Sequence, residues 1–334
     1  MNNGQKPKIV YLGSPDFAVP ALAALLQAGY SLPLVITQPD RPKGRKRQLA
    51  PTAVKQFAEA AGLKVLAVEN VNRPEVLAEI QAAEPDLLVV AAFGQLLRPA
   101  VWQAAPLGAV NIHASLLPEY RGAAPIQQAL IDGREKTGVT LMYIEERLDA
   151  GDMLARAECN ILPEDNAGTL RERLAALGAD LLLENLPKLL ASQLPAEPQN
   201  EAQATYAGKI TAAHELLDWQ AQAEELHNLL RGLTPDTSAY TCYQDGQGWQ
   251  RLKIWRMEVA EAHGNAAAPG VVFGADKKGL LVAAGEGAVR LLQVQPAGKG
   301  RMAAADWWRG RQDLHQAGLC FSKPDNIGNS GKEK

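Results

Sequence analysis

One short stretch limits most strongly what this chain can fold into: residues 86–92, with the sequence DLLVVAA, are almost continuously apolar. A strand with this pattern is buried on both faces, as the central strands of a parallel sheet are. Further strand-like patterns occur at 8–13, 32–37, 64–68 and 110–114. A helical pattern that ends at Gly29 separates the first two. Strands that alternate with helices predict a doubly wound, mostly parallel α/β sheet with a Rossmann-like layer order.

A proline-containing stretch with little periodicity, residues 186–209, ends this alternation and is typical of a linker. Beyond a helical segment at 221–230, short strand patterns are separated by glycine-containing turns, which predicts a small β-rich barrel. We therefore expect an N-terminal domain at 1–190, a linker at 191–209, a C-terminal domain at 210–320 and a disordered tail at 321–334.

Composition excludes several classes of protein. Hydrophobic residues make up 47% of the 334 residues and charged residues 21%, which argues against a disordered chain. The sequence lacks an apolar run of about 18 residues and an N-terminal secretory signal, so we expect a cytoplasmic protein. Its three cysteines are too widely spaced for a close-spaced zinc motif or a disulfide framework. A net charge of −3 argues against a strongly basic nucleic-acid binder but permits a local basic patch.

The turn after the first predicted strand, Gly13-Ser-Pro-Asp-Phe17, is not a nucleotide-binding loop. It lacks the second glycine of the GxGxxG motif and the lysine of a P-loop, so dinucleotide binding is not supported. In open α/β sheets a ligand still binds beyond the carboxyl ends of the strands. The residues that follow Val90 and Val110 are therefore the candidates for a site.

Asn111 and His113 lie two residues apart on a predicted strand, so their side chains share one face of the sheet. An amide can donate to a developing oxyanion, and an imidazole can carry a proton near neutral pH. The structural alternative is an Asn that bonds a turn and a His that is satisfied in the core. Spacing alone leaves both interpretations open.

Two carboxylates, Asp149 and Asp152, lie around Gly151. Asp and Gly favour surface turns, which is the structural interpretation. A carboxylate here can also reach His113, hold its tautomer and help to accept a proton. The spacing does not choose between the two interpretations.

A second charged feature is a run of cations that contains Arg41, Lys43, Arg45, Lys46 and Arg47. Asp40 is the single acid among residues 40–48. A solvated loop explains such a run, and so does contact with the phosphates of a nucleic acid.

Several of these motifs resemble the folate-dependent formyltransferase superfamily. The segment Asn111-Ile-His-Ala-Ser-Leu-Leu-Pro118, with Leu148-Asp149-Ala-Gly151 farther along, is similar to the superfamily's catalytic signature. Other segments are similar to the branch that formylates methionyl-tRNA: residues 12–18, 37–45, 121–127 and 292–299. The resemblance therefore covers nearly the whole chain.

The resemblance implies a formyltransferase catalytic domain at 1–190 and an OB-like, tRNA-binding domain at 210–320. The implied donor is 10-formyltetrahydrofolate, without a metal. The implied acceptor is the α-amino group of methionine on initiator methionyl-tRNA, for translation initiation. We expect the protein to be a monomer.

It also implies residue roles. Asn111 would orient the formyl oxygen, His113 would assist at the tetrahedral centre, and Asp149 would pair with His113 and help to remove the proton of the amine. The folate would contact Phe93, Gly94, Gln95, Leu96, Leu97, Ser115, Leu116, Leu117 and Pro118. The tRNA would contact Arg41, Lys43, Arg45, Lys46, Arg47 and Lys209.

One segment departs from the resemblance, and two other functions compete. Residues 232–240 lack the aromatic-rich stretch expected of the family and keep only Pro235 in place. The same chemistry on an amino sugar linked to a nucleotide is disfavoured by the cationic loop around Arg45. A catalytically silent RNA-binding protein is disfavoured because Asn111, His113 and Asp149 are all present.

Overall fold

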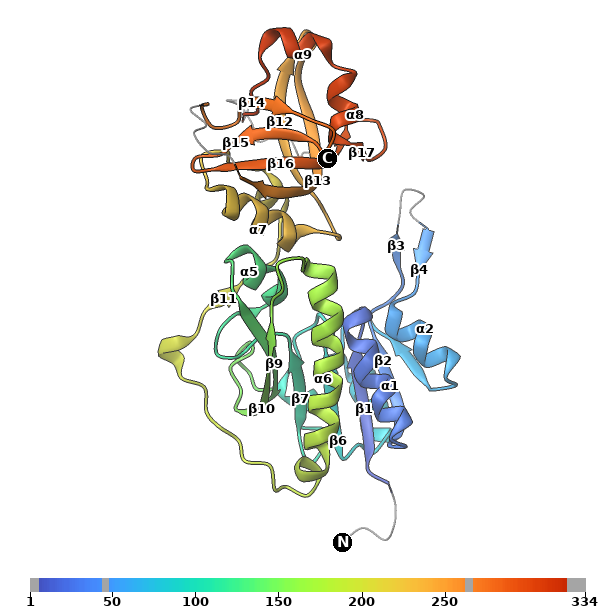
Figure 1. Ribbon diagram of the computed structural model, residues 1–334. Coiled ribbons are helices and arrows are strands. Elements are labelled where there is room, and N and C mark those ends of the chain that lie inside the picture. The colour runs from blue at the N-terminus through green and yellow to red at the C-terminus, as the bar shows by residue number, and fades with distance from the viewer. Residues whose placement is uncertain (1–5, 44–47, 262–266, 323–334) are drawn as a thin grey trace. The chain divides into compact units, whose positions relative to one another are not determined.

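The apolar run at 86–92 forms strand β6 (Leu87–Ala91), all of whose residues are buried. The structure is a computed structural model, and it describes residues 6–43, 48–261 and 267–322 (Figure 1). β6 pairs in parallel with β1 (Lys8–Gly13) on one side and with β7 (Ala109–His113) on the other. This apolar strand is therefore interior to its sheet, as its pattern predicts.

The sheet has seven strands in the order β10-β9-β7-β6-β1-β2-β5. The remaining strands are β2 (Ser31–Thr37), β5 (Val65–Ala67), β9 (Lys136–Tyr143) and β10 (Met153–Asn160). From β5 to β7 the neighbouring strands pair in parallel, whereas β9 is antiparallel to both β7 and β10. The predicted Rossmann-like, mostly parallel sheet is confirmed, and the β9–β10 hairpin extends it.

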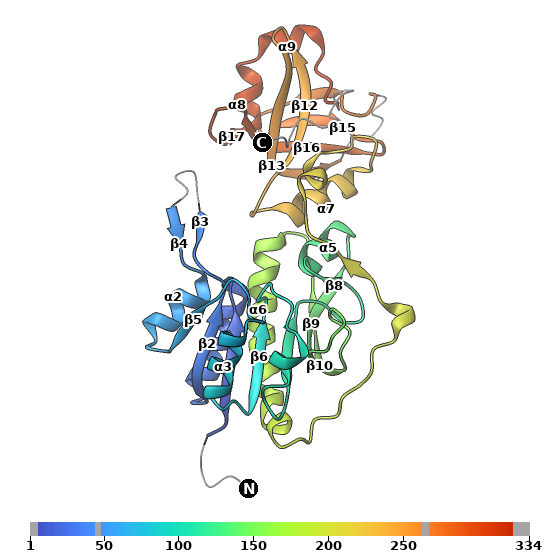
Figure 2. The same cartoon turned by 180° about the vertical axis from the view of Figure 1, so that it is seen from behind.

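Helices cover both faces of this sheet. α1 (Val19–Gln27) and the long α6 (Ala167–Leu190) lie on one face, and α3 (Pro74–Ala82) lies on the other (Figures 1 and 2). α3 and α4 (Pro99–Trp102) contribute Val76, Ile80 and Val101 to an apolar cluster with β1, β2 and β6. Shorter elements complete the unit: η1 (Asp16–Ala18), β3 (Arg41–Lys43), β4 (Gln48–Ala50), α2 (Ala53–Ala60) and β8 (Arg121–Gly122).

Residues 191–209 pack on this same unit. They contain η2 (Glu201–Gln203) and β11 (Tyr206–Ala207), and β11 pairs in parallel with β8. The chain divides into two compact units, and all described residues from 210 onward belong to the second unit. Residues 127–134 and 162–168 group with the second unit, although they come from the first half of the sequence.

The second unit is built on an antiparallel sheet that curls. Its strands are β12 (Ala239–Asp245), β13 (Gly248–Ala260), β14 (Val272–Ala275), β15 (Leu280–Ala283), β16 (Ala288–Pro296) and β17 (Met302–Ala303). The helices of this unit are η3 (Ala212–Glu215), α7 (Ala223–Leu233), α8 (Ala304–Arg309), α9 (Gln312–Ala317) and most of α5 (Pro125–Ile131).

Residues 319–322 connect the two edges of the curled sheet. The N–H of Ser322 donates to the carbonyl of Cys242 in β12 at 2.9 Å, and the N–H of Val272 in β14 donates to Leu319 at 2.9 Å. The Phe321 side chain is 1% exposed and stacks on Trp219 at 5.6 Å between ring centroids. The curled β-rich sheet agrees with the predicted OB-like barrel, and residues 323–334 of the predicted tail lie outside the described residues.

Among the residues that the structure describes, no helix is both long enough and apolar enough to cross a bilayer.

Close packing of α6 depends on a glycine. A Cβ added to Gly178 would lie 2.7 Å from Cγ2 of Ile112 on β7 and 3.4 Å from Cγ1 of Val139 on β9. The helix can therefore approach the strand that carries Asn111 and His113 only where a side chain is missing.

We predict that Gly178→Val forces α6 away from β7 and lowers the free energy of unfolding by about 1–3 kcal/mol, the usual range for overpacking. Urea unfolding measures this change. Ala176→Val is the control, because it adds a valine to the exposed face of the same helix. Equal losses for the two variants would contradict the packing argument.

Candidate active site

Strand β7 carries two polar side chains on one face. Ile112 points toward Gly178 of α6, so Asn111 and His113 face the opposite side of the sheet. Asn111 is half-buried, and His113 is 5% exposed. The carboxyl end of β7 lies beside that of β6, because Ala91 pairs with Ile112. The site therefore forms where the loops that follow these two strands meet.

The imidazole of His113 lies between a carbonyl and a carboxylate. Its Nε2 is 3.0 Å from the carbonyl oxygen of Tyr120, and its Nδ1 is 3.8 Å from Oδ2 of Asp149. A carbonyl accepts hydrogen bonds only, so this contact places the ring proton on Nε2 in the neutral form. The other ring nitrogen, Nδ1, faces the carboxylate of Asp149.

A turn at residues 149–151, the Asp149 turn, holds the carboxylate of Asp149 in a fixed place. The N–H of Gly122 donates to Oδ2 of Asp149 at 2.8 Å. Asp149 has φ 49°, a left-handed conformation that costs a non-glycine residue about 1–2 kcal/mol. Next in this turn, Gly151 approaches so closely that a Cβ would collide with the carbonyl oxygen of Tyr143. Surrounding contacts must therefore stabilise this turn.

The segment 115–118 follows β7 directly and is anchored to β9. The hydroxyl of the fully buried Thr140 donates to the carbonyl of Ser115 at 2.7 Å and accepts from the N–H of Leu117 at 3.0 Å. The Ser115 hydroxyl donates to the carbonyl of Glu119 at 2.6 Å. Leu117 and Pro118 are buried and Leu116 is half-buried, so these contacts hold the turn in place directly after His113.

The predicted folate residues 93–97 form the loop after β6. The carbonyl of Phe93 accepts from Nε2 of Gln38 at 2.9 Å, and Gly94 takes φ 81°. The Gln95 side chain accepts from the N–H of Val71 at 2.8 Å. Phe93 and Leu97 are buried, whereas Leu96 is 58% exposed. The loop is therefore anchored through its ends and presents one apolar side chain.

Of the six predicted cations, the structure describes Arg41, Lys43 and Lys209, and these three lie on other segments than the residues described above. Arg41 lies on β3, after β2 of the sheet, and its guanidinium pairs with Glu69 at 2.6 Å. Lys43 ends the same strand, and Lys209 is an exposed residue after β11. The other three, Arg45, Lys46 and Arg47, lie outside the described residues.

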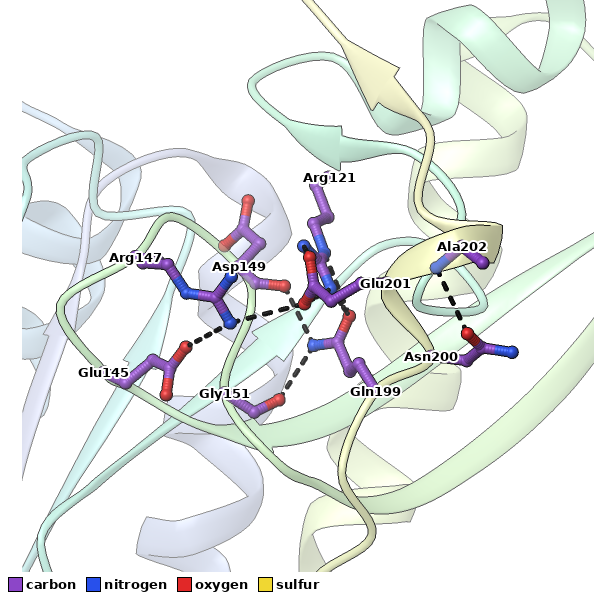
Figure 3. A network of polar contacts seen from close by, with 9 residues as sticks. All are labelled: Arg121, Glu145, Arg147, Asp149, Gly151, Gln199, Asn200, Glu201 and Ala202. Carbon is purple, nitrogen blue, oxygen red and sulfur yellow. Dashed lines mark hydrogen bonds and ion pairs between the residues drawn. The ribbon is translucent and has the colours of Figure 1, made fainter.

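A buried arginine next to the site was not predicted. Arg121 is 1% exposed, and its guanidinium donates to Gln199 and Glu201 (Figure 3). Hydrogen bonding to Glu201 raises the pKa of Arg121, and the reciprocal bond lowers the pKa of Glu201. Arg147 also pairs with Glu201, at 3.3 Å. These partners are 78 and 80 residues from Arg121 in the sequence, so no local pattern indicates them.

The candidate site belongs to an α/β fold without a phosphate loop, and comparisons with known proteins give its class. The model of the formyl transferase family matches residues 7–186, and that of the formyl transferase C-terminal domain matches residues 209–312. The chain belongs to the formyl transferase family.

Curated relatives are similar over nearly the whole chain. The methionyl-tRNA formyltransferase of Bacillus subtilis is 46% identical over 91% of this chain and 94% of the relative. That of Geobacillus thermodenitrificans is 47% identical over 90% and 93%. Among solved structures, WlaRD, a sugar 3N-formyl transferase, covers 89% of this chain and 100% of its own with a TM-score of 0.64. At 18% identity, that likeness shows the fold alone.

The ion pair of Arg121 and Glu201 makes the stability of the fold depend on pH. Because the pKa of Glu201 is lowered below its usual value of about 4.3, the stabilisation is present above that value. It is lost as the pH falls through the lowered pKa of the folded state. Glu201→Gln cannot titrate, so we expect its unfolding free energy to fall less steeply than that of the parent from about pH 5 to about pH 3.

Urea unfolding at a series of pH values measures these slopes. Glu158→Gln is the control, because Glu158 pairs with Lys136 at 3.2 Å on the surface, where a salt bridge stabilises little. Identical acid slopes for Glu201→Gln and the parent would contradict the assignment.

Proposed function

We propose that this chain transfers the formyl group of 10-formyltetrahydrofolate to the α-amino group of methionine esterified to initiator tRNA, for translation initiation. The relatives named above are methionyl-tRNA formyltransferases, which supports this substrate pair. The structural observation that carries the proposal is the distance of 3.8 Å between Nδ1 of His113 and Oδ2 of Asp149. His113 lies two residues after Asn111 on β7.

The acceptor needs little activation. A free α-amino group has a pKa of about 7.7–8.0, and esterification of the neighbouring carboxyl lowers it further. A substantial fraction of the amine is therefore an uncharged nucleophile at neutral pH. The site has to align the amine with the formyl carbon, stabilise the charge that develops on the formyl oxygen and remove a proton from the amine. As the new carbon–nitrogen bond forms, the bond from the formyl carbon to N10 of the folate breaks, and N10 leaves with a proton, so that tetrahydrofolate is released.

Three side chains perform these tasks. The Asn111 amide donates to the formyl oxygen and stabilises its growing negative charge, an interaction that contributes about 3 kcal/mol at comparable sites. His113 accepts a proton on Nδ1, because its Nε2 is held by the carbonyl of Tyr120. Asp149 stabilises the imidazolium that results and helps to remove the proton of the amine.

The residues around this group fit a reduced folate. Leu96 and Leu148 are 58% and 56% exposed, on loops after β6 and before Asp149. Exposed apolar side chains, together with the bonded backbone of the 115–118 turn, suit a flat heterocyclic ring. The structural relative WlaRD was solved in the presence of 5-N-formyl-THF, a related folate. When bound, the folate supplies the activated formyl group.

The tRNA acceptor end needs cations near the amine. We assign this contact to Arg41, Lys43, Arg45, Lys46 and Arg47, with Lys209 at the end of the first unit. Each phosphate that such a cation neutralises adds affinity that falls with salt.

The assignment predicts that His113→Ala lowers kcat by about 10²- to 10⁴-fold and Asn111→Ala by about 10²- to 10³-fold. The assay incubates each purified variant with 10-formyltetrahydrofolate and charged initiator tRNA, and then analyses the released aminoacyl group for formylmethionine. His315→Ala is the control, because this exposed histidine contacts the carbonyl of Trp308 in the second unit.

Two outcomes would contradict the proposal. Unchanged turnover by His113→Ala would reject the catalytic assignment. Formylation of a nucleotide-linked amino sugar, with methionyl-tRNA left unmodified, would reject the acceptor.

The cationic segment provides a separate prediction, which rests on five cations between positions 41 and 47. Arg45→Ala should raise the KM for tRNA and reduce the salt slope of tRNA binding by about 1, because one phosphate contact is lost. The affinity for the folate should stay unchanged. Lys64→Ala is the control, since Lys64 pairs with Glu79 at 2.7 Å on the surface. Equal losses of tRNA and folate binding would contradict this role.

A further inference from the structure

The Asp149 turn is held by a side chain from a distant segment. The Nε2 of Gln199 donates to the carbonyl of Asp149 at 2.9 Å and to the carbonyl of Gly151 at 2.8 Å (Figure 3). Gln199 lies about 50 residues farther along the chain and is half-buried. Both hydrogens of one amide are thus used to fix the left-handed residue and the glycine of this turn.

The orientation of the Gln199 amide is itself fixed. Its Oε1 accepts from Nε and Nη2 of Arg121 at 3.0 and 2.8 Å. A reversed amide would turn its NH₂ group toward the guanidinium and its oxygen toward two carbonyls, so the observed orientation is the one that satisfies all the groups. The other edge of Arg121 donates to both carboxylate oxygens of Glu201, at 3.1 and 2.9 Å.

The same small region holds the carboxylate of Asp149. Gly122, which donates to Oδ2 of Asp149, is the residue after Arg121. β8, formed by Arg121 and Gly122, pairs with β11 of the segment that carries Gln199. The backbone of Asp149 is therefore held by Gln199 and its side chain by Gly122, and Arg121 connects the two.

We propose that Gln199 is a positioning residue for the transfer reaction: its amide holds the Asp149 turn so that the carboxylate faces Nδ1 of His113. This inference rests on the role proposed above for Asp149. Without the two donated hydrogen bonds, a residue at φ 49° has less to offset its strain and relaxes away from this conformation. The carboxylate then moves from the imidazole, and proton removal slows.

Gln199→Glu tests the proposal. The new carboxylate still accepts from Arg121 but has no hydrogen to donate to the carbonyls of Asp149 and Gly151. We expect kcat to fall by on the order of 10²-fold, the effect of a misplacement of about 1 Å, with little change in the KM of either substrate.

Asn200→Asp is the matched control. It makes the same change from amide to acid at the next position, which is exposed. Its side chain caps η2 through an oxygen that accepts from the N–H of Ala202 at 3.1 Å, and an aspartate keeps that acceptor. This variant should retain the parent's kcat, and an equal loss in both variants would overturn the proposal, because charge alone would then explain the effect.

A double-mutant cycle with Asp149→Asn separates positioning from a general structural role. If Gln199 acts through Asp149, Gln199→Glu lowers kcat in the parent but causes little further loss of kcat in the Asp149→Asn background. The same factor in both backgrounds would overturn the proposal. Should Gln199→Glu fail to fold, as judged by its circular dichroism, Gln199→Met enters the same cycle, because it has a similar length and no amide.

The cycle also distinguishes the two levels of the argument. Full activity of Asp149→Asn would reject the function proposed for Asp149. A strong loss in Asp149→Asn together with full activity of Gln199→Glu would leave that function standing and overturn the inference about Gln199.

Discussion

The site depends on the register of β7 between its two neighbours. β7 pairs with β6 in parallel and with β9 in the antiparallel sense, so its main chain is bonded on both sides. Because side chains alternate along a strand, a slip of one residue would move Asn111 and His113 into the apolar layer under α6. The close packing of Ile112 against Gly178 opposes this slip, because there is little space between β7 and α6 at this point. Ordinary packing thus determines which face carries the polar pair.

The sequence predicts those parts of the fold whose cause is local. Residues 87–91 are apolar because they are buried on both faces, and this pattern indicates a central strand without any partner being known. The β9–β10 hairpin and α6 were not predicted, and in each case the sequence pattern has a physical reason to mislead. On β9, the polar residue Thr140 interrupts the apolar pattern, yet it is buried, and its hydroxyl is hydrogen-bonded to the 115–118 turn. Gly178 and Pro187 resemble helix breakers, although α6 continues through both.

The site shows the same limit. The spacing of Asn111 and His113 predicts a shared face, and the motif resemblance suggests Asp149 as the partner of the imidazole. The contacts that hold this partner are made by Arg121 and Gln199, which only the folded chain brings together. A glutamine within a proline-containing stretch has no distinctive local pattern. Its importance follows from the two carbonyls it reaches and from the buried guanidinium that fixes its orientation.

The pairing of β8 with β11 has a practical consequence for dissecting this chain. An excised catalytic half that stops at 190 would lose Gln199 and Glu201, and with them acceptors of the guanidinium of Arg121, a residue that is only 1% exposed. A buried charge deprived of its partner costs about 3–5 kcal/mol, a large part of the stability of a typical domain. We therefore expect an autonomous fragment to extend at least through Ala207, where the strand pairing with β8 ends.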